Sequence, residues 1–147
     1  MKFSCSVTIN KPKEHVIKYF MNTEYLKEYQ EGFLKKELIS GPEQEEGSIA
    51  KLYYKMGKGH MELTETVIEN KLPDYFYAQY YHKHTENTMK THFKEISDNA
   101  TQLTSEIHYT AFKGFMIKTL AFLFPGMFKK QVQKWLNNLK TFAESQA

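Results

Sequence analysis

The hydrophobic period of the chain changes near Gly114, after a long alternating region, and this change constrains the fold more than any other feature of the sequence. From about Phe33 to Phe112, apolar and polar residues alternate in six runs, separated by Gly-Pro-Glu, Gly-Lys-Gly, Leu-Pro-Asp, Glu-Asn and Asp-Asn. Such alternation predicts strands, and the short breaks predict an antiparallel meander. After Gly114 the apolar residues recur at three- and four-residue steps, which predicts a helix.

The segment before the meander predicts one more strand and two short helices. Residues 3–9 alternate as in a half-buried strand. Asn10 is placed to cap one helix, with Pro12 in its first turn, and Thr23 to cap a shorter one. The long last helix is entered through a break at Pro125-Gly126. We therefore expect an α+β fold in one domain over residues 1–147, because a chain of this length buries one substantial core.

The composition argues against several classes of function. The 20 Lys+Arg and 17 Asp+Glu residues leave a net charge of +3, scattered along the chain, so we expect no nucleic-acid partner. The single Cys5 and an N-terminus without the apolar core of a signal peptide predict a cytoplasmic protein. The apolar stretch 114–128 contains Lys118 and Pro125 and is too short to span a bilayer, so stable membrane insertion is not expected. No motif predicts a cofactor.

Two motifs stand at the ends of this pattern: Asn-Lys-Pro-Lys-Glu-His-Val at the entry to the first helix, and Trp-Leu-Asn-Asn-Leu-Lys-Thr-Phe-Ala-Glu in the last. With them, the order of elements resembles the START-related helix-grip superfamily (SRPBCC), in its bacterial polyketide-cyclase/dehydrase-like branch, over nearly the whole chain. The resemblance implies a curved sheet of about seven antiparallel strands wrapped round a long C-terminal helix. It also implies an apolar ligand, such as a lipid or polyketide, between them, and it leaves open whether a reaction follows.

The turns predict which residues face that cavity, because residues opposite one another in an antiparallel pair share a face. A three-residue loop at 57–59 puts Glu65 on the outer face, and the next turn then places Glu62 opposite His82 on the inner face. Further along, Lys90 is expected opposite Glu106 on the outer face. The residues predicted to bind ligand are Leu52, Tyr54, Met56, Thr64, Thr66, Ile68, Phe76, Tyr80, Thr91, Phe93, Ser105, Ile107 and Tyr109 from the sheet, and Phe128, Val132, Trp135 and Leu139 from the last helix.

The predicted inner face carries more polar groups than a dry core tolerates, so we interpret it as a hydrated ligand cavity, with a filled core as the alternative. Glu62 and His82 are the candidate catalytic residues, since a carboxylate beside an imidazole forms the acid–base pair that a cyclase or dehydratase needs for enolisation. The alternative is a structural hydrogen-bonded pair. His82 and His84 lack a third ligand, so no metal site is predicted.

The stretch 115–124 is apolar on too many sides for a surface helix. We expect it to pack on the sheet, with a mobile entrance gate or a homodimer contact as alternatives. The leading functional hypothesis is a non-enzymatic binder or carrier of an apolar small molecule. A cyclase or dehydratase is the second hypothesis, and a module that meets a protein or membrane through 115–124 is the third.

Overall fold

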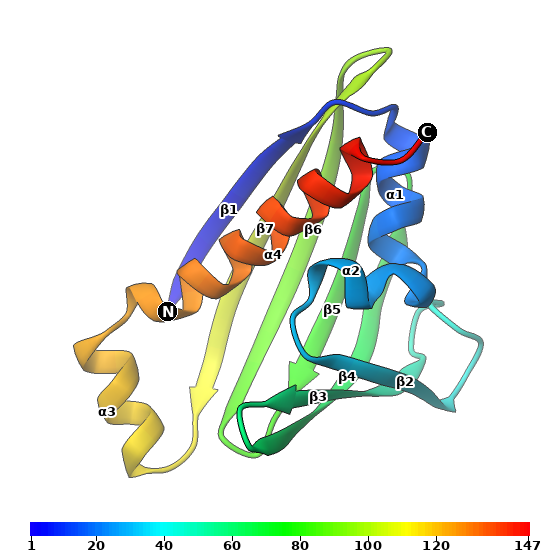
Figure 1. Cartoon of the computed structure of the whole chain (residues 1–147). Helices are drawn as coiled ribbons and strands as arrows, with labels where there is room; N and C mark the ends of the chain where they lie inside the picture. Colours follow the sequence, from blue (N-terminus) through cyan, green and yellow to red (C-terminus); the bar gives the residue numbers. More distant parts are fainter.

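A computed structural model describes all residues, 1–147, and contains one antiparallel sheet with helices against one of its faces (Figure 1). The seven strands lie in the order β1-β7-β6-β5-β4-β3-β2. This confirms the predicted α+β fold with its long C-terminal helix. In chain order the elements are β1 (Lys2–Ile9), α1 (Lys13–Met21), the 3-10 helix η1 (Thr23–Tyr25), α2 (Leu26–Tyr29), β2 (Phe33–Ser40), β3 (Ile49–Met56), β4 (Gly59–Lys71), β5 (Tyr75–Tyr81), β6 (Thr85–Ser97), β7 (Ala100–Phe112), α3 (Phe115–Leu123) and α4 (Gly126–Glu144).

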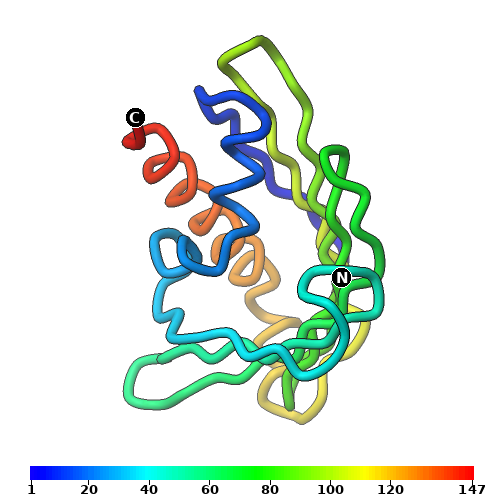
Figure 2. Tube along the Cα trace, turned by 90° about the vertical axis from the view of Figure 1, so that its right-hand side faces the viewer, coloured from blue at the N-terminus to red at the C-terminus, as the bar shows by residue number.

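The sheet curves around α4. In Figure 1, β2 and β3 run across the direction of the other strands, and Figure 2 shows the helices inside the resulting bend. The buried stripe of α4 consists of Leu136, Leu139 and Ala143, whose spacing of three and four residues keeps them on one helical face. These side chains join a core that includes Cys5 and Leu103 on the neighbouring strands β1 and β7.

The helix entries differ from the predicted caps. The N-cap position of α1 is Pro12, and the backbone N–H of Asn10 instead donates to Glu144 Oε2 at 2.7 Å. The start of η1 is capped by Asn22, whose side-chain oxygen accepts from the N–H of Glu24 at 2.9 Å. Both segments are nevertheless helical where the apolar spacing predicted helices.

The β3–β4 hairpin corrects the predicted register. Its turn holds two residues, Gly57 and Lys58, so that Met56 pairs with Gly59. Gly57 has a φ of 59°, a left-handed conformation that tight two-residue hairpin turns require. Because a shift of one residue inverts a strand, Glu65 faces inward, opposite Ala50. The predicted inner positions Glu62, Thr64 and Thr66 therefore lie on the outer face.

A β-bulge then restores the predicted faces in the following strands. Val67 pairs with Ala78 and Glu69 with Tyr77, so that Ile68 is the extra residue and the alternation of β4 changes phase there. Phe76 and Tyr80 lie on the inner face of β5, as predicted, and the predicted pairing of Lys90 with Glu106 is confirmed. The pairing of Glu62 with His82 was wrong, since Glu62 lies opposite Tyr53 and on the other face.

Candidate ligand site on the inner face of the sheet

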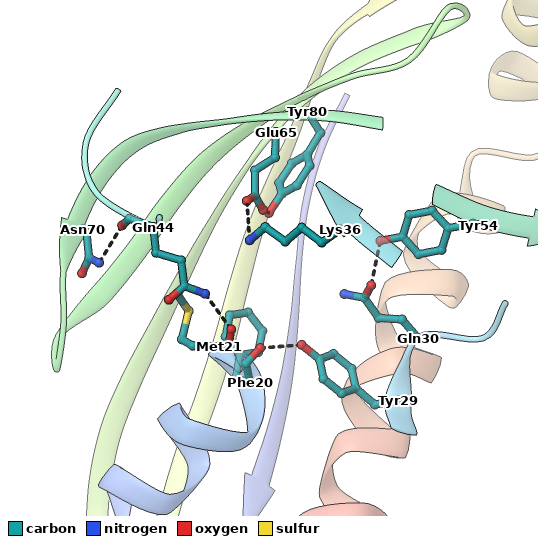
Figure 3. A network of polar contacts seen from close by, with 10 residues as sticks. All are labelled: Phe20, Met21, Tyr29, Gln30, Lys36, Gln44, Tyr54, Glu65, Asn70 and Tyr80. Carbon is teal, nitrogen blue, oxygen red and sulfur yellow. Dashed lines mark hydrogen bonds and ion pairs between the residues drawn. The ribbon is translucent and has the colours of Figure 1, made fainter. Parts of the chain in front are cut away.

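A buried charged cluster lies on the inner face where β2, β4 and β5 face the helices. Lys36 Nζ is 3.2 Å from Glu65 Oε1, and the two side chains are 9% and 8% exposed. Tyr80 donates its phenolic hydrogen to the other carboxylate oxygen of Glu65 at 2.7 Å (Figure 3). Lys36 lies opposite Leu52, a buried inner residue of β3, because β2 is irregular between Phe33 and Lys35. Two strand irregularities thus bring these charges inside.

The hydrogen-bonding capacity of this cluster is only partly used. Both oxygens of Glu65 have partners, whereas the three N–H donors of the Lys36 ammonium group meet one carboxylate. Buried ions are stable only when they are paired and hydrogen-bonded. The remaining donors of Lys36 can therefore bind an acceptor atom of a ligand.

The phenols around the cluster are held in their neutral, proton-donating form. Burial of the hydroxyl group, the nearby negative charge of Glu65 and the hydrogen bond to it raise the pKa of Tyr80 well above its usual value of 10.0. Burial likewise raises the pKa of Tyr54 and Tyr29. Tyr54 donates to Gln30 Oε1 at 2.7 Å, and Tyr29 donates to the carbonyl oxygen of Phe20 at 2.6 Å (Figure 3).

Trp135 of α4 contributes a polar atom without a partner. Its ring stacks on that of Tyr54, with centroids 5.8 Å apart and planes 15° apart. The indole Nε1 is buried and has no hydrogen-bond acceptor. Buried N–H groups are nearly always paired, so an unpaired one on the helix that faces the sheet is a second place where a ligand acceptor would be stabilised.

The inward side chains of the sheet differ in how far they are buried. Inward side chains near the hairpin of β3 and β4 and the end of β7 are half-buried, although they lie beneath the helical layer: Met61, Leu63, Tyr80, Met89 and Tyr109. Those at the end covered by α1 are fully buried: Val67, Phe76, Thr91, Phe93 and Leu103. A hollow of about 700 Å³ also opens between α2 and β2, and Phe33 and Lys36 are among its lining residues. The Lys36 side chain therefore borders a hollow that opens to solvent.

The predicted acid–base pair is not assembled. Glu62 is exposed on the outer face, where it forms an ion pair with Lys51 at 2.8 Å. His82 follows β5, and its Nδ1 accepts from the backbone N–H of His84 at 3.3 Å. Burial, followed by the charges of His84 and Lys83, lowers the pKa of His82. The rings of His82 and His84 meet edge to face at 5.4 Å, and no three His, Cys, Asp or Glu side chains form a group that could hold a metal ion.

The other predicted ligand-binding residues include one exposed residue, one hydrogen-bonded pair and several packed apolar residues. Met56, at the exposed hairpin, is 53% exposed and turned out to lie outside the covered region. Thr91 and Ser105 are buried and share a hydrogen bond of 2.8 Å, so neither hydroxyl is free. Phe128 contacts the Tyr109 ring, with centroids 4.8 Å apart. The remaining inward positions are Leu52, Phe93 and Ile107 in the sheet, with Val132 half-buried and Leu139 buried on α4.

Sequence reasoning missed the central residues of the cluster, Lys36 and Glu65. Charged residues within alternating strands are ordinarily read as solvent-facing, and the one-residue error in the hairpin placed Glu65 outside. The sequence of β4 does contain a signal for the position of Glu65. The apolar residues Met61, Leu63 and Val67 occupy every second position or a multiple of it, and Glu65 falls in the same series, so it shares their face of the strand.

Comparison with known proteins rests on structure alone. No family model matches the sequence, and no curated protein matches it. The Zhui aromatase/cyclase from Streptomyces sp. R1128 is similar with a TM-score of 0.79 at 10% identity, over 98% of this chain and 93% of that one. The chain has the helix-grip fold. Other helix-grip structures similar to it are a protein from Thermus thermophilus (TM-score 0.77, 12% identity, 97% of both chains) and a ginseng major latex-like protein from Panax ginseng (0.72, 11%, 97% of both).

Proposed function

We propose that this helix-grip domain binds a small, mostly apolar molecule that carries an oxygen acceptor, between the inner face of the sheet and α4. The observation that carries the proposal is the Lys36 ammonium group, which has a single carboxylate partner and belongs to a side chain that is 9% exposed. A buried cation with unused donors stabilises an acceptor atom strongly, and most strongly an anionic one.

The surroundings of the cluster suit the apolar part of such a molecule. Met61, Leu63 and Met89 present flexible or branched apolar surface that is half-buried. Trp135 and Tyr54 add stacked aromatic surface, and the Trp135 N–H is available to a second acceptor. Apolar walls with a few convergent polar groups are the usual composition of a small-molecule site.

A pair of fluorescent probes with one ring skeleton tests the role of the charge. 8-Anilinonaphthalene-1-sulfonate carries an anionic group, and N-phenyl-1-naphthylamine does not. We expect K36M/E65Q, which removes both charges of the cluster together, to weaken sulfonate binding at least about tenfold while the neutral probe changes little. The double substitution avoids leaving one buried charge without its partner.

The matched control is K51M/E62Q, which removes the same two groups from the outer face of β3 and β4. It should leave both affinities unchanged. Equal sulfonate affinity in K36M/E65Q and the wild type, in protein that melts cooperatively, would refute a ligand contact at Lys36. Native mass spectrometry of protein purified gently from its own cells would then show whether any apolar molecule is carried at all.

Acid–base chemistry on the same ligand is a second candidate. It is favoured by the presence of two proton donors, Lys36 and Tyr80, on one carboxylate, in the fold that the Zhui aromatase/cyclase also has. In such a site Lys36 and Tyr80 would polarise a ligand carbonyl, and the Glu65 carboxylate would accept the proton lost from the adjacent carbon. Incubation of 2-acetylnaphthalene in D₂O, followed by NMR, would detect this as exchange of the methyl hydrogens. Exchange no faster with the wild type than with E65Q would remove the enzyme hypothesis.

A further inference from the structure

The helix α3 presents an apolar surface that the rest of the chain leaves uncovered. Phe115 and Phe122 are each 85% exposed and Met116 is 79% exposed, whereas Ala121 is the one buried residue of the helix. Figure 1 shows α3 projecting beyond the end of the sheet. The sequence expectation that this segment packs on the sheet was therefore wrong for most of its side chains. Large apolar side chains that are exposed next to one another on a folded domain mark sites of interaction.

The charge around α3 has one sign. Between Glu106 and Glu144 the chain contains no acidic residue and six lysines. Three of these lysines pair with carboxylates: Lys113 with Glu86, Lys134 with Glu31 and Lys140 with Glu144. The other three, Lys118, Lys129 and Lys130, have no carboxylate partner and stand on α3 and on the first turns of α4.

A surface hollow joins the apolar and the basic parts of this face. It has a volume of about 450 Å³ and lies at the junction of α3 and α4. Phe124 and Met127 supply its apolar lining, and Lys130, Lys134 and Gln131 supply polar groups. Apolar side chains that project outward therefore lie next to cations and hydrogen-bond donors.

We propose that this face docks reversibly on an anionic lipid bilayer, with the Phe115, Met116 and Phe122 side chains among the acyl chains and the free lysines at the headgroups. A bilayer with anionic lipids offers an apolar interior for the exposed aromatic side chains and negatively charged headgroups for the lysines. A second copy of the chain fits less well, because a two-fold contact through α3 would bring like charges together. None of the helices combines the length and the apolar composition of a membrane span.

Sedimentation with vesicles tests this docking. We expect the wild-type protein to bind vesicles of phosphatidylcholine with phosphatidylserine far better than phosphatidylcholine alone, and to release as salt is raised. F115S/F122S should lower the partition coefficient roughly tenfold or more. The matched control is L34S/I96S, which removes two apolar side chains, each 53% exposed, from β2 and β6.

Charge reversal separates the electrostatic contribution to vesicle binding from the contribution of the apolar side chains. K118E/K129E/K130E should weaken binding to phosphatidylserine vesicles by at least about fivefold for each lysine, because each substitution removes a positive charge and adds a negative one. The control K18E/K27E/K94E changes the net charge equally, on exposed lysines of α1, α2 and β6, and should bind nearly as the wild type does. Absence of vesicle binding by the wild type, or equal losses in both sets of variants, would overturn the proposal. A dimer abolished by F115S/F122S, without vesicle binding, would assign the face to a second copy instead.

Discussion

The ammonium group of Lys36 lies 3.2 Å from the Glu65 carboxylate, and neither side chain is more than a tenth exposed. Lys51 and Glu62 form a similar ion pair at 2.8 Å on the opposite face of the sheet, where the side chains are 39% and 50% exposed. The chain therefore contains its own comparison between a buried and an exposed Lys–Glu pair.

Breaking the buried pair should destabilise the fold much more than breaking the exposed one. Lys36→Met leaves the Glu65 carboxylate buried without its cation, and we expect a loss of about 3 to 5 kcal/mol in the free energy of unfolding. Lys51→Met leaves Glu62 in water and should have little measurable effect. Urea denaturation of the two variants gives both values, and equal stabilities would mean that Glu65 is hydrated or protonated in the folded state.

Tyrosine ionisation should report the buried phenols. Burial raises the pKa of Tyr109 to about 12, and the pKa values of Tyr29, Tyr54 and Tyr80 are also raised. An ultraviolet titration near pH 11 should therefore find these four of the ten tyrosines still protonated in folded protein. Unfolding in urea at the same pH should allow these four phenols to ionise immediately. Simultaneous titration of all ten in the folded state would contradict the structure.

The same shifts predict how stability depends on alkaline pH. A phenol whose folded pKa exceeds the unfolded value of 10.0 keeps its proton in the folded state after the unfolded state has lost it. Its contribution is complete below pH 10 and is lost as the pH rises from there toward the folded pKa. Tyr80→Phe should make the decline above pH 10 less steep, measured by urea denaturation at a series of pH values.

The sequence predicted the architecture because hydrophobic period and most turn residues act locally. The break predicted at Glu86-Asn87 was wrong, since these residues lie within β6 and pair with Tyr81 and Tyr80. It predicted the faces of β5, β6 and β7 correctly, since Phe76, Thr91 and Ser105 all lie inward. The face of β4 was inverted, because a two-residue and a three-residue hairpin at Gly57 differ by one position and invert the strand. The extra residue at the Ile68 bulge restored the predicted faces in the strands that follow. Local propensities do not predict where such an insertion occurs.

The candidate site was less predictable than the fold. Lys36 faces inward because of an irregularity in β2, and Glu65 faces inward because of the hairpin register. Each charge alone is typical of a solvent-facing strand position, and only their meeting inside the domain makes their burial favourable. Pairing across three strands is a tertiary property. It requires the register to be known before the residues can be recognised as a site.

The hydroxyl pair of Thr91 and Ser105 should behave as structure and not as ligand contact. Both residues are buried and their hydroxyl groups are 2.8 Å apart. Thr91→Val leaves the Ser105 hydroxyl unpaired and should cost about 1 to 3 kcal/mol of stability. T91V/S105A should recover part of that loss, as a double-mutant cycle by urea denaturation would show. Additive losses would mean that water or a ligand already satisfies each hydroxyl separately.

Trp135 should respond directly to an occupied site, because it is the only tryptophan of the chain and its indole N–H is buried without an acceptor. A ligand carbonyl or carboxylate near this group would form a hydrogen bond and shift the emission to longer wavelength. Dodecanoate, which does not absorb where tryptophan is excited, is a suitable probe, with dodecyltrimethylammonium as a chain-matched cation. We expect dodecanoate to shift the emission saturably, and K36M/E65Q to require roughly tenfold more of it, while K51M/E62Q behaves as the wild type does. An equal shift with the cation would indicate detergent-like binding to the apolar surface of α3, and F115S/F122S would then abolish it.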